Sequence, residues 1–350
     1  MKVAIDARLI GGTSTGDSTY WTCFIQSFVE NYPEVELAFI SNQERPINVP
    51  FLAKSSWIVA PARSSRWWSM VTFPLLARKW GADIAHGQYG ISPLCKNGIS
   101  TVHDVSFMVN PSWFSKRDQV LLRTGVQVAA KSAKRIITVS ETSKKEIDHY
   151  FSAARAKTRV AFNACPPWIQ KNDDNQIVHA LGIKDEYLLT VSTNWARKNM
   201  QLALTSTALL CQELNMKLVV TGKQGEELRG VHVVSTGYVE TDQLSALYSG
   251  AKMTLAPSLH EGFGITLLEA MRCGSPVLCG PGGAMPEVAG TAGFVMPDYD
   301  PITWATAIGK LLRDPSKLSE LAAKGTERER EFTWAQSAQA HYDVYRELVK

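Results

Sequence analysis

The sequence predicts an α/β protein built from two doubly wound domains. The length of 350 residues exceeds what one ordinary hydrophobic core supports. Two successive series of short β-branched runs alternate with stretches of helical spacing, as in parallel sheets covered on both faces. Pro166 and Pro167, followed by the polar run Lys171–Gln176, separate the two series. Ligands of such folds bind beyond the carboxyl ends of the strands, so we expect a site in a central cleft that both domains face.

The expected strands follow the chain in order. The first series is Val3–Ile5, Leu37–Ile40, Ile58–Ala60, Asp83–His86, Ser100–Val102, Ile136–Val139 and Arg159–Phe162, and the second is Leu188–Val191, Leu218–Thr221, His232–Val234, Met253–Leu255, Pro276–Cys279 and Gly293–Met296. We therefore predict a first domain at 1–166 and a second at 167–333. The segment 334–350 has Tyr342, Tyr345 and Leu348 at helical spacing, and we expect it to pack back on the first domain.

Composition excludes several classes of protein. Apolar residues make up 45% and charged residues 20%, which rules out a disordered chain. Six cysteines lie scattered without a C-x-x-C pair, so we expect them to act as small buried hydrophobes. We find no run of about 20 apolar residues, and Met1–Ile10 is too short for a signal-peptide core, so we expect a cytoplasmic protein.

The net charge of +4 is unevenly distributed. Up to Gln170 the chain carries 20 basic against 12 acidic residues, and beyond it 17 against 21. The basic half indicates a surface that faces an anionic partner, such as phosphate groups or a membrane. The alternative is that both halves have ordinary surfaces.

Two motifs resemble ligand sites but fail on inspection. Gly11, Gly16 and Ser18 fit a phosphate-binding loop, but Asp17 stands where the essential lysine belongs, which argues against a nucleotide triphosphatase. The D-x-D run Asp298–Asp300 precedes Pro301, which predicts a helix cap rather than a metal site. The histidines have no metal-ligand spacing, and no metal is proposed.

The segment Ser258–Met271 carries the strongest chemical signal. It follows an expected strand and opens a helix, and its two glycines together with the helix N-terminus suit an anion. Glu261 precedes this helix and Glu269 lies on it two turns later, so both carboxylates can accept hydrogen bonds from sugar hydroxyls. The alternative is a tight turn with a solvated glutamate. Arg197 and Lys198 follow another strand, where they suit a diphosphate or form a basic loop in solvent.

Together these residues resemble the retaining glycosyltransferases of family 4, the glycosyl transferases group 1, which have the GT-B fold of two Rossmann-like domains. The resemblance covers nearly the whole chain. The segments that carry it are Thr101–Phe107 with Pro111, Val139–Ser143, Arg197–Asn199, Gly237–Val239, the E-x7-E pair Glu261 and Glu269, Gly274–Val277, Pro286–Gly290 and Phe332–Trp334.

The resemblance implies a role for each candidate. Glu269 would hold the ribose hydroxyls, Arg197 and Lys198 the diphosphate, and Glu261 the transferred sugar. His103 would line the catalytic cleft, although a lone histidine after a strand is more often structural. The remaining expected contacts to the nucleotide sugar are Gly11, Gly12, Thr193, Gly222, Lys223, Val239, Gly262, Phe263, Gly264 and Ile265.

The family chemistry implies retention of anomeric configuration, without a metal or other cofactor. Fixed cations and N–H donors would stabilise the departing phosphate, and we expect closure of the domains to exclude water. The loop Gly16–Tyr20 departs from the family's Gly-x-Gly-Arg-Tyr type, which leaves the acceptor open, and Asp17 is a candidate for its hydroxyls.

The stretch Arg63–Trp80 interleaves basic residues with tryptophans. It suits a membrane interface or a lipid-linked acceptor, and core packing is the alternative. No nucleic-acid motif accompanies it.

We therefore predict a hexosyltransferase that acts on a hydroxyl of a glycan or lipid-linked acceptor in bacterial polysaccharide or glycolipid synthesis. UDP-glucose is the first candidate donor and GDP-mannose the second. The alternatives are a GT-B-fold nucleotide-sugar epimerase or hydrolase, and a catalytically idle sugar-nucleotide-binding partner subunit.

Overall fold

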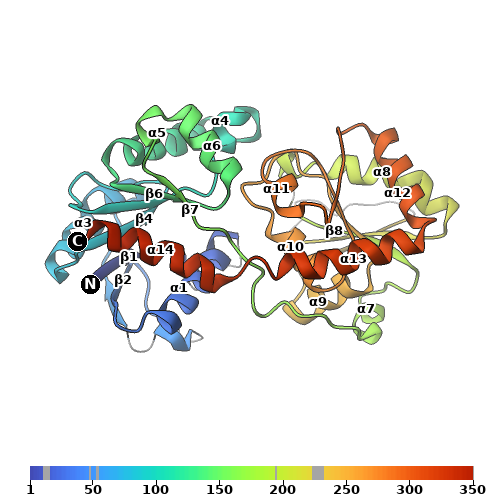
Figure 1. The fold of residues 1–350 in the computed structure, drawn as a ribbon, viewed down its shortest axis with the longest axis horizontal. Helices are drawn as coiled ribbons and strands as arrows, with labels where there is room; N and C mark the ends of the chain where they lie inside the picture. The colour runs from blue at the N-terminus through green and yellow to red at the C-terminus, as the bar shows by residue number, and fades with distance from the viewer. Residues whose placement is uncertain (11–15, 47–48, 53–54, 194, 223–231, 350) are drawn as a thin grey trace. The chain divides into compact units, whose positions relative to one another are not determined.

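The computed structural model describes residues 1–10, 16–46, 49–52, 55–193, 195–222 and 232–349. It divides into two compact units, 1–163 with 333–350 and 164–332 (Figure 1). The sequence placed these boundaries at 166 and 333, within a few residues of the observed ones. Each unit contains one parallel sheet with helices on both faces, so the predicted fold class is confirmed.

The first unit contains a seven-stranded sheet in the order β3-β2-β1-β4-β5-β6-β7. Its strands are β1 Lys2–Asp6, β2 Glu36–Ser41, β3 Ser56–Val59, β4 Ile84–Gln88, β5 Gly98–Thr101, β6 Arg135–Thr138 and β7 Thr158–Val160. Its helices are α1 Gly16–Asn31, α2 Ser65–Trp67, α3 Phe73–Trp80, α4 Ser106–Val109, α5 Lys116–Ser132, α6 Glu141–Tyr150 and α14 Trp334–Leu348, with a π-helical turn at Trp68–Thr72 and 3-10 turns at Pro50–Leu52, Pro111–Trp113 and Ser152–Ala154. All seven strands lie where the apolar runs predicted them.

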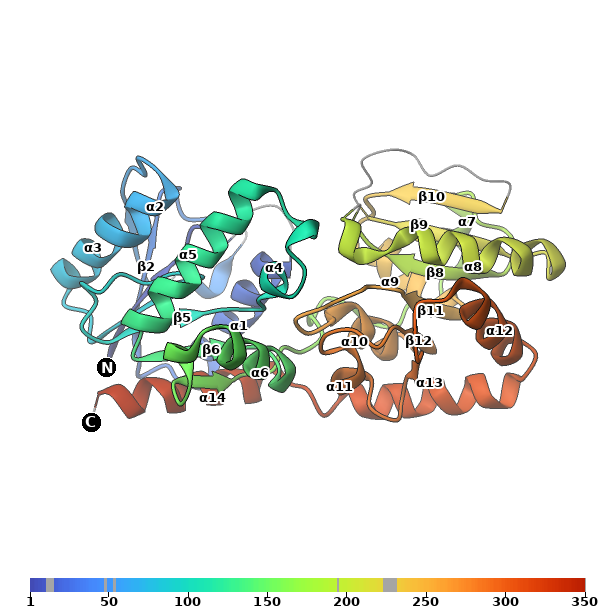
Figure 2. The same cartoon turned by 90° about the horizontal axis from the view of Figure 1, so that it is seen from above.

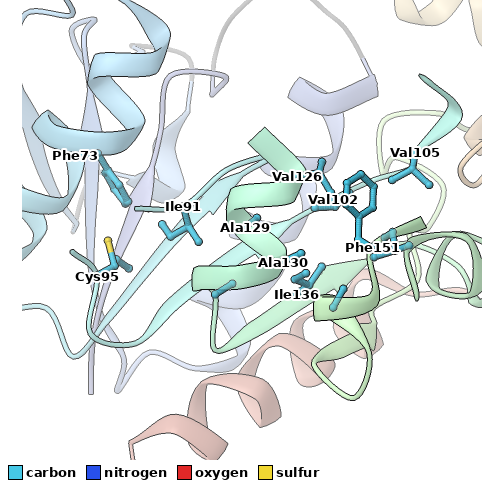
Figure 3. Packing of buried hydrophobic residues seen from close by; sticks show 14 of the residues in the cluster. Phe73, Ile91, Cys95, Val102, Val105, Val126, Ala129, Ala130, Ile136 and Phe151 are labelled. Atoms are coloured by element: carbon cyan, nitrogen blue, oxygen red, sulfur yellow. The ribbon is translucent and has the colours of Figure 1, made fainter. Parts of the chain in front are cut away.

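Two helical layers cover this sheet. On one face, Val126, Ala129 and Ala130 of α5 pack with Ile136 of β6 and Phe151 in an apolar core (Figure 3). The other face is covered by α1 and α14, which lie side by side (Figures 1 and 2). Helix α14 therefore joins the first unit although it follows the second unit in the chain.

The second unit contains a six-stranded sheet in the order β10-β9-β8-β11-β12-β13. Its strands are β8 Tyr187–Val191, β9 Lys217–Thr221, β10 Val233–Gly237, β11 Met253–Ala256, β12 Val277–Cys279 and β13 Phe294–Val295. Its helices are α7 Asn175–Ala180, α8 Met200–Glu213, α9 Thr241–Gly250, α10 Ile265–Arg272, α11 Met285–Ala289, α12 Pro301–Leu312 and α13 Pro315–Glu329, with a 3-10 turn at Ala196–Lys198. Helices α8 and α12 pack on one face, and α9 and α10 lie on the other (Figure 1).

Three further expectations can be compared with the structure. All six cysteines are free and buried, which confirms their role as small hydrophobes. Asp300 caps α12 by accepting a 2.8 Å hydrogen bond from the Thr303 N–H, so the D-x-D run is the predicted helix start. Among the described residues, no helix is long and apolar enough to cross a bilayer.

Candidate functional site

The centre of the candidate site lies where two neighbouring strands of the second unit end. Strands β8 and β11 are parallel partners, with Leu188 opposite Met253. Their carboxyl ends therefore meet at one edge of the sheet. The backbone N–H of Leu259, after β11, donates a 2.7 Å hydrogen bond to the carbonyl of Arg197, after β8. The two loops that carry the predicted site residues are thus directly joined.

Three charged side chains meet at this junction. Glu261 Oε2 accepts a 2.9 Å hydrogen bond from Arg197 Nη1, and Glu261 Oε1 accepts a 2.6 Å bond from Lys198 Nζ. Burial alone would raise the pKa of Glu261, but the adjacent Lys198 and Arg197 outweigh it and hold that pKa below its usual range. Two cations and one carboxylate leave one net positive charge at the edge of the sheet, which suits an anionic ligand.

A glycine loop after β12 holds the Glu261 segment in place. Gly283 has φ +63°, and a Cβ there would lie 2.3 Å from the carbonyl oxygen of Glu261, so only glycine fits. The next residue, Ala284, donates a 2.9 Å backbone hydrogen bond to that same carbonyl. Tyr299 Oη donates to the Ser258 carbonyl at 2.8 Å. The sequence analysis did not predict these contacts to the Glu261 segment, although the Gly282-Gly283 pair after a strand was a visible sign of a tight loop.

Helix α10 begins directly beside the charged cluster. Gly264 precedes it with φ +95°, a left-handed conformation that glycine adopts without strain. No side chain among the described residues caps this helix start. The N–H groups of its first turn and the positive end of the helix dipole are therefore suited to a phosphate. Glu269 lies on the same helix, where its Oε2 accepts a 2.8 Å hydrogen bond from Tyr248 Oη.

A narrow pocket opens between the ends of β8 and β11. Lys198, Thr190 and Thr266 line it, together with Ser258. The Oγ1 of Thr190 is buried and has no hydrogen-bond partner among the residues that the structure describes. Buried hydroxyls are normally paired, so this atom is suited to a bound polar group.

The other predicted contacts of the second unit lie around this edge. Gly222 follows β9 with φ +118°, and a Cβ there would lie 2.2 Å from the Ser192 carbonyl, next to Thr193. Val239 follows β10 and is buried. Lys223 lies outside the described residues.

One side chain of the glycine-rich segment before α10, that of Phe263, points away from solvent. Phe263 is buried, and its ring packs edge-on against Phe332 at 5.6 Å between centroids. Its ring therefore stabilises the loop, and its backbone is the part that remains for a ligand. Gly262 is adjacent, and Ile265 begins α10.

In the first unit, His103 follows β5 at the carboxyl edge of the sheet. It is 8% exposed, and its Nε2 lies 3.7 Å from Asp17 Oδ1 with no hydrogen-bond partner among the described residues. Asp17 Oδ2 accepts a 2.7 Å hydrogen bond from the Gln88 amide, at the end of β4. Tyr20 packs edge-on against the His103 ring at 4.7 Å. The structure thus pairs His103 with Asp17, whereas Gly11 and Gly12 lie outside the described residues.

No metal centre is formed by the side chains that the structure describes. Within those ranges, no group of three or more His, Cys, Asp or Glu residues is arranged to hold an ion. The candidate site therefore consists of fixed cations, backbone N–H groups and carboxylates.

Comparison with known proteins agrees with this geometry. Residues 185–314, which include Arg197, Lys198, Glu261 and Glu269, match the family model described as Glycosyl transferases group 1. The match indicates a glycosyltransferase. This glycosyltransferase is 27% identical to the O-antigen chain mannosyltransferase B of Escherichia coli, over 92% of this chain and 89% of that protein. It is 28% identical to the O-antigen chain mannosyltransferase RfbU of Salmonella typhimurium, over 65% of this chain and 64% of that one.

A solved structure shows the same GT-B fold. WaaG, a glycosyltransferase involved in lipopolysaccharide biosynthesis, superposes with a TM-score of 0.77 at 16% identity, over 98% of this chain and 99% of that one. The family model does not reach His103, which belongs to the first unit of this glycosyltransferase.

Proposed function

We propose that this glycosyltransferase transfers mannose from GDP-mannose, with retention of configuration, to a hydroxyl of a glycan or lipid-linked acceptor in bacterial polysaccharide or glycolipid synthesis. The observation that carries the proposal is the partly buried trio of Arg197, Lys198 and Glu261 beside the start of α10, which no described side chain caps. The names of the relatives favour mannose, so GDP-mannose replaces UDP-glucose as the first candidate donor.

The trio supports the chemistry of the donor. The glycosidic bond breaks as negative charge accumulates on the departing diphosphate, so cations and N–H groups held in place beforehand stabilise the transition state more than the ground state. Arg197 and Lys198 bind the diphosphate together with the α10 N-terminus. Glu261, released from the cations, accepts hydrogen bonds from the sugar. Glu269 holds the ribose, and the leaving diphosphate assists deprotonation of the acceptor hydroxyl.

Donor choice is tested by titration calorimetry with GDP-mannose and UDP-glucose, followed by acceptor trials and NMR of the product anomer. We expect tighter binding of GDP-mannose and an α-linked product, because retention preserves the donor's configuration. Tighter binding of UDP-glucose would reverse the order of the donors, and an inverted product would exclude retention.

Incubation with the donor alone separates the rival activities. An epimerase or hydrolase converts GDP-mannose without an acceptor, whereas a transferase needs the acceptor for rapid turnover. A binding protein without catalysis does not convert GDP-mannose, either with or without the acceptor. We expect release of GDP to accelerate strongly when a suitable acceptor is added.

We also propose peripheral contact of the first unit with an anionic membrane at the cytoplasmic face. Trp67 is 45% exposed and Leu75 is 52% exposed on the α2–α3 segment. The exposed basic residues of the same segment are Arg63, Arg66, Arg78 and Lys79. Exposed apolar side chains interleaved with cations along one segment suit lipid head groups. A lipid-linked acceptor would then be close to the enzyme.

A further inference from the structure

Glu269 is held from behind by a buried tyrosine. Tyr248 of α9 is fully buried and donates a 2.8 Å hydrogen bond from its Oη to Glu269 Oε2. Burial raises the pKa of Glu269, and this hydrogen bond opposes that effect by favouring the charged carboxylate. One oxygen of the carboxylate is therefore occupied and directed by a neighbouring helix.

The other oxygen of Glu269 remains for a ligand. Within the part of the chain that the structure describes, Oε1 accepts no hydrogen bond, and the side chain is partly exposed. Glu269 stands two turns after Gly262, on the helix whose N-terminus suits the phosphates. A nucleoside diphosphate bound there by its phosphates would have its ribose within reach of the same helix.

We propose that Tyr248 is a positioning residue that orients Glu269 Oε1 toward the ribose hydroxyls of the donor nucleotide. The inference rests on the proposed function, because it takes a nucleotide sugar as the ligand. A hydroxyl that already occupies Oε2 limits rotation of the carboxylate, so less conformational entropy is lost when the ribose binds. Tyr248 itself does not touch the nucleotide.

The substitution Tyr248→Phe keeps the buried ring and removes only the hydroxyl. A matched control is Tyr187→Phe, because Tyr187 is also buried in the second unit and its Oη donates a 2.8 Å hydrogen bond to a backbone carbonyl, that of Leu247. Both variants lose one buried tyrosine hydroxyl, and only the first one loses a contact to Glu269. A nonspecific cost of losing such a hydroxyl would affect both.

Titration calorimetry with GDP and 2′,3′-dideoxy-GDP tests the inference on the full chain. We expect Tyr248→Phe to weaken GDP binding by about threefold to tenfold, as for one lost hydrogen bond. Binding of the dideoxy nucleotide should change much less, because it has no ribose hydroxyls to lose. Tyr187→Phe should preserve the wild-type ratio of the two affinities. An unchanged ratio in Tyr248→Phe overturns the inference.

A double variant shows whether Tyr248 acts through Glu269. If it does, Glu269→Ala and Glu269→Ala/Tyr248→Phe bind GDP equally well, because the tyrosine has nothing left to orient. A further loss in the double variant contradicts the inference.

The same calorimetry distinguishes failure of the proposed function from failure of the inference. If wild-type protein binds neither GDP nor UDP, the proposed function fails and the inference falls with it. If GDP binds and Tyr248→Phe leaves the ratio unchanged, only the inference fails. Where UDP binds more tightly, UDP and 2′,3′-dideoxy-UDP replace the guanosine pair.

Discussion

At the residue scale, a partly buried trio brings together residues for which the sequence predicted separate roles. Arg197 and Lys198 were expected to meet the diphosphate and Glu261 the sugar, but the structure pairs all three. Adjacent cations repel each other, and a carboxylate between them reduces that repulsion and satisfies their donors. Binding of a diphosphate would exchange one anionic partner for another, so the cations need little reorganisation.

Lys198→Ala should lower turnover far more than affinity for intact donor. The lysine charge has its largest effect as the diphosphate departs, and removing one such group typically costs on the order of 100-fold in kcat. Steady-state kinetics with GDP-mannose, together with calorimetry of donor binding, measures the two effects separately. Lys198→Arg, which keeps the charge, is the control and should retain more activity. Equal kcat in wild type and Lys198→Ala would remove the lysine from the reaction.

Activity should persist in excess EDTA. The prediction rests on the groups that are present, because two side-chain cations and the α10 N-terminus supply positive charge where a metal-dependent enzyme would place its ion. The measurement is GDP release with and without EDTA at constant pH. Activity that EDTA abolishes and that magnesium or manganese restores would contradict a metal-independent reaction.

At the scale of elements, Arg63–Trp80 is both core and surface. Trp68, Phe73 and Ala77 are buried, which supports the core interpretation for one side of the segment. Trp67 and Leu75 of the same segment are exposed. The sequence left both interpretations open, because tryptophans beside basic residues carry no information about which side meets the sheet.

Replacing Arg63, Arg66, Arg78 and Lys79 with Gln should reduce binding to anionic vesicles. Each basic residue near such a surface contributes about 1 kcal/mol at low salt, and salt screens the contribution. Sedimentation with phosphatidylserine vesicles measures the loss, and neutral vesicles are the control. Donor affinity, measured by calorimetry, should stay unchanged because none of these four residues is among the expected contacts to the nucleotide sugar. Equal sedimentation of variant and wild type would refute the membrane contact.

Helices α1 and α14 enclose a buried polar network in the first unit. His341 Nε2 and Tyr20 Oη lie 2.8 Å apart, and His86 bonds Tyr345 Oη at 2.7 Å and Thr101 Oγ1 at 2.8 Å. Burial lowers the pKa of His341 to about 4 and also holds the pKa of His86 well below its usual range. Both rings are therefore neutral in the folded protein at neutral pH.

Acid should weaken the first unit well before carboxylates titrate fully. Between pH 6.5 and 4, His341 takes up a proton when unfolded but not when folded, so stability falls as pH falls through this window. At pH 5 the loss from His341 is about 2 kcal/mol. Urea unfolding at pH 7.5 and pH 5 measures it, and His341→Gln, which can still form hydrogen bonds, should show a smaller difference between the two pH values. An identical difference in both proteins would contradict the assignment.

At the scale of the whole molecule, the strands were the most predictable part. Runs such as Val3–Ile5 and Leu218–Val220 are apolar throughout because both faces of a parallel sheet are covered. The positions of the candidate residues after these strands were predictable as well, because ligands of such sheets bind beyond the carboxyl ends of the strands. The Gly282-Gly283 pair was a local signal, but the residues that Gly283 and Tyr248 support were not predictable, because each contact joins residues about 20 positions apart.

Unfolding of this glycosyltransferase should occur in two transitions, of which the nucleotide stabilises one. Each unit has its own apolar core, and the proposed nucleotide contacts that the structure describes at Arg197, Lys198 and Glu269 all belong to the second unit. A ligand at about 100 times its Kd stabilises the unit that binds it by about 2.7 kcal/mol. Differential scanning calorimetry with GDP should therefore raise the Tm of one transition and leave the other nearly unchanged. His341→Gln identifies the first unit, because it should lower the transition that GDP does not move. A single transition that GDP and His341→Gln both shift would mean that the two units unfold together and that their cores are not thermodynamically independent.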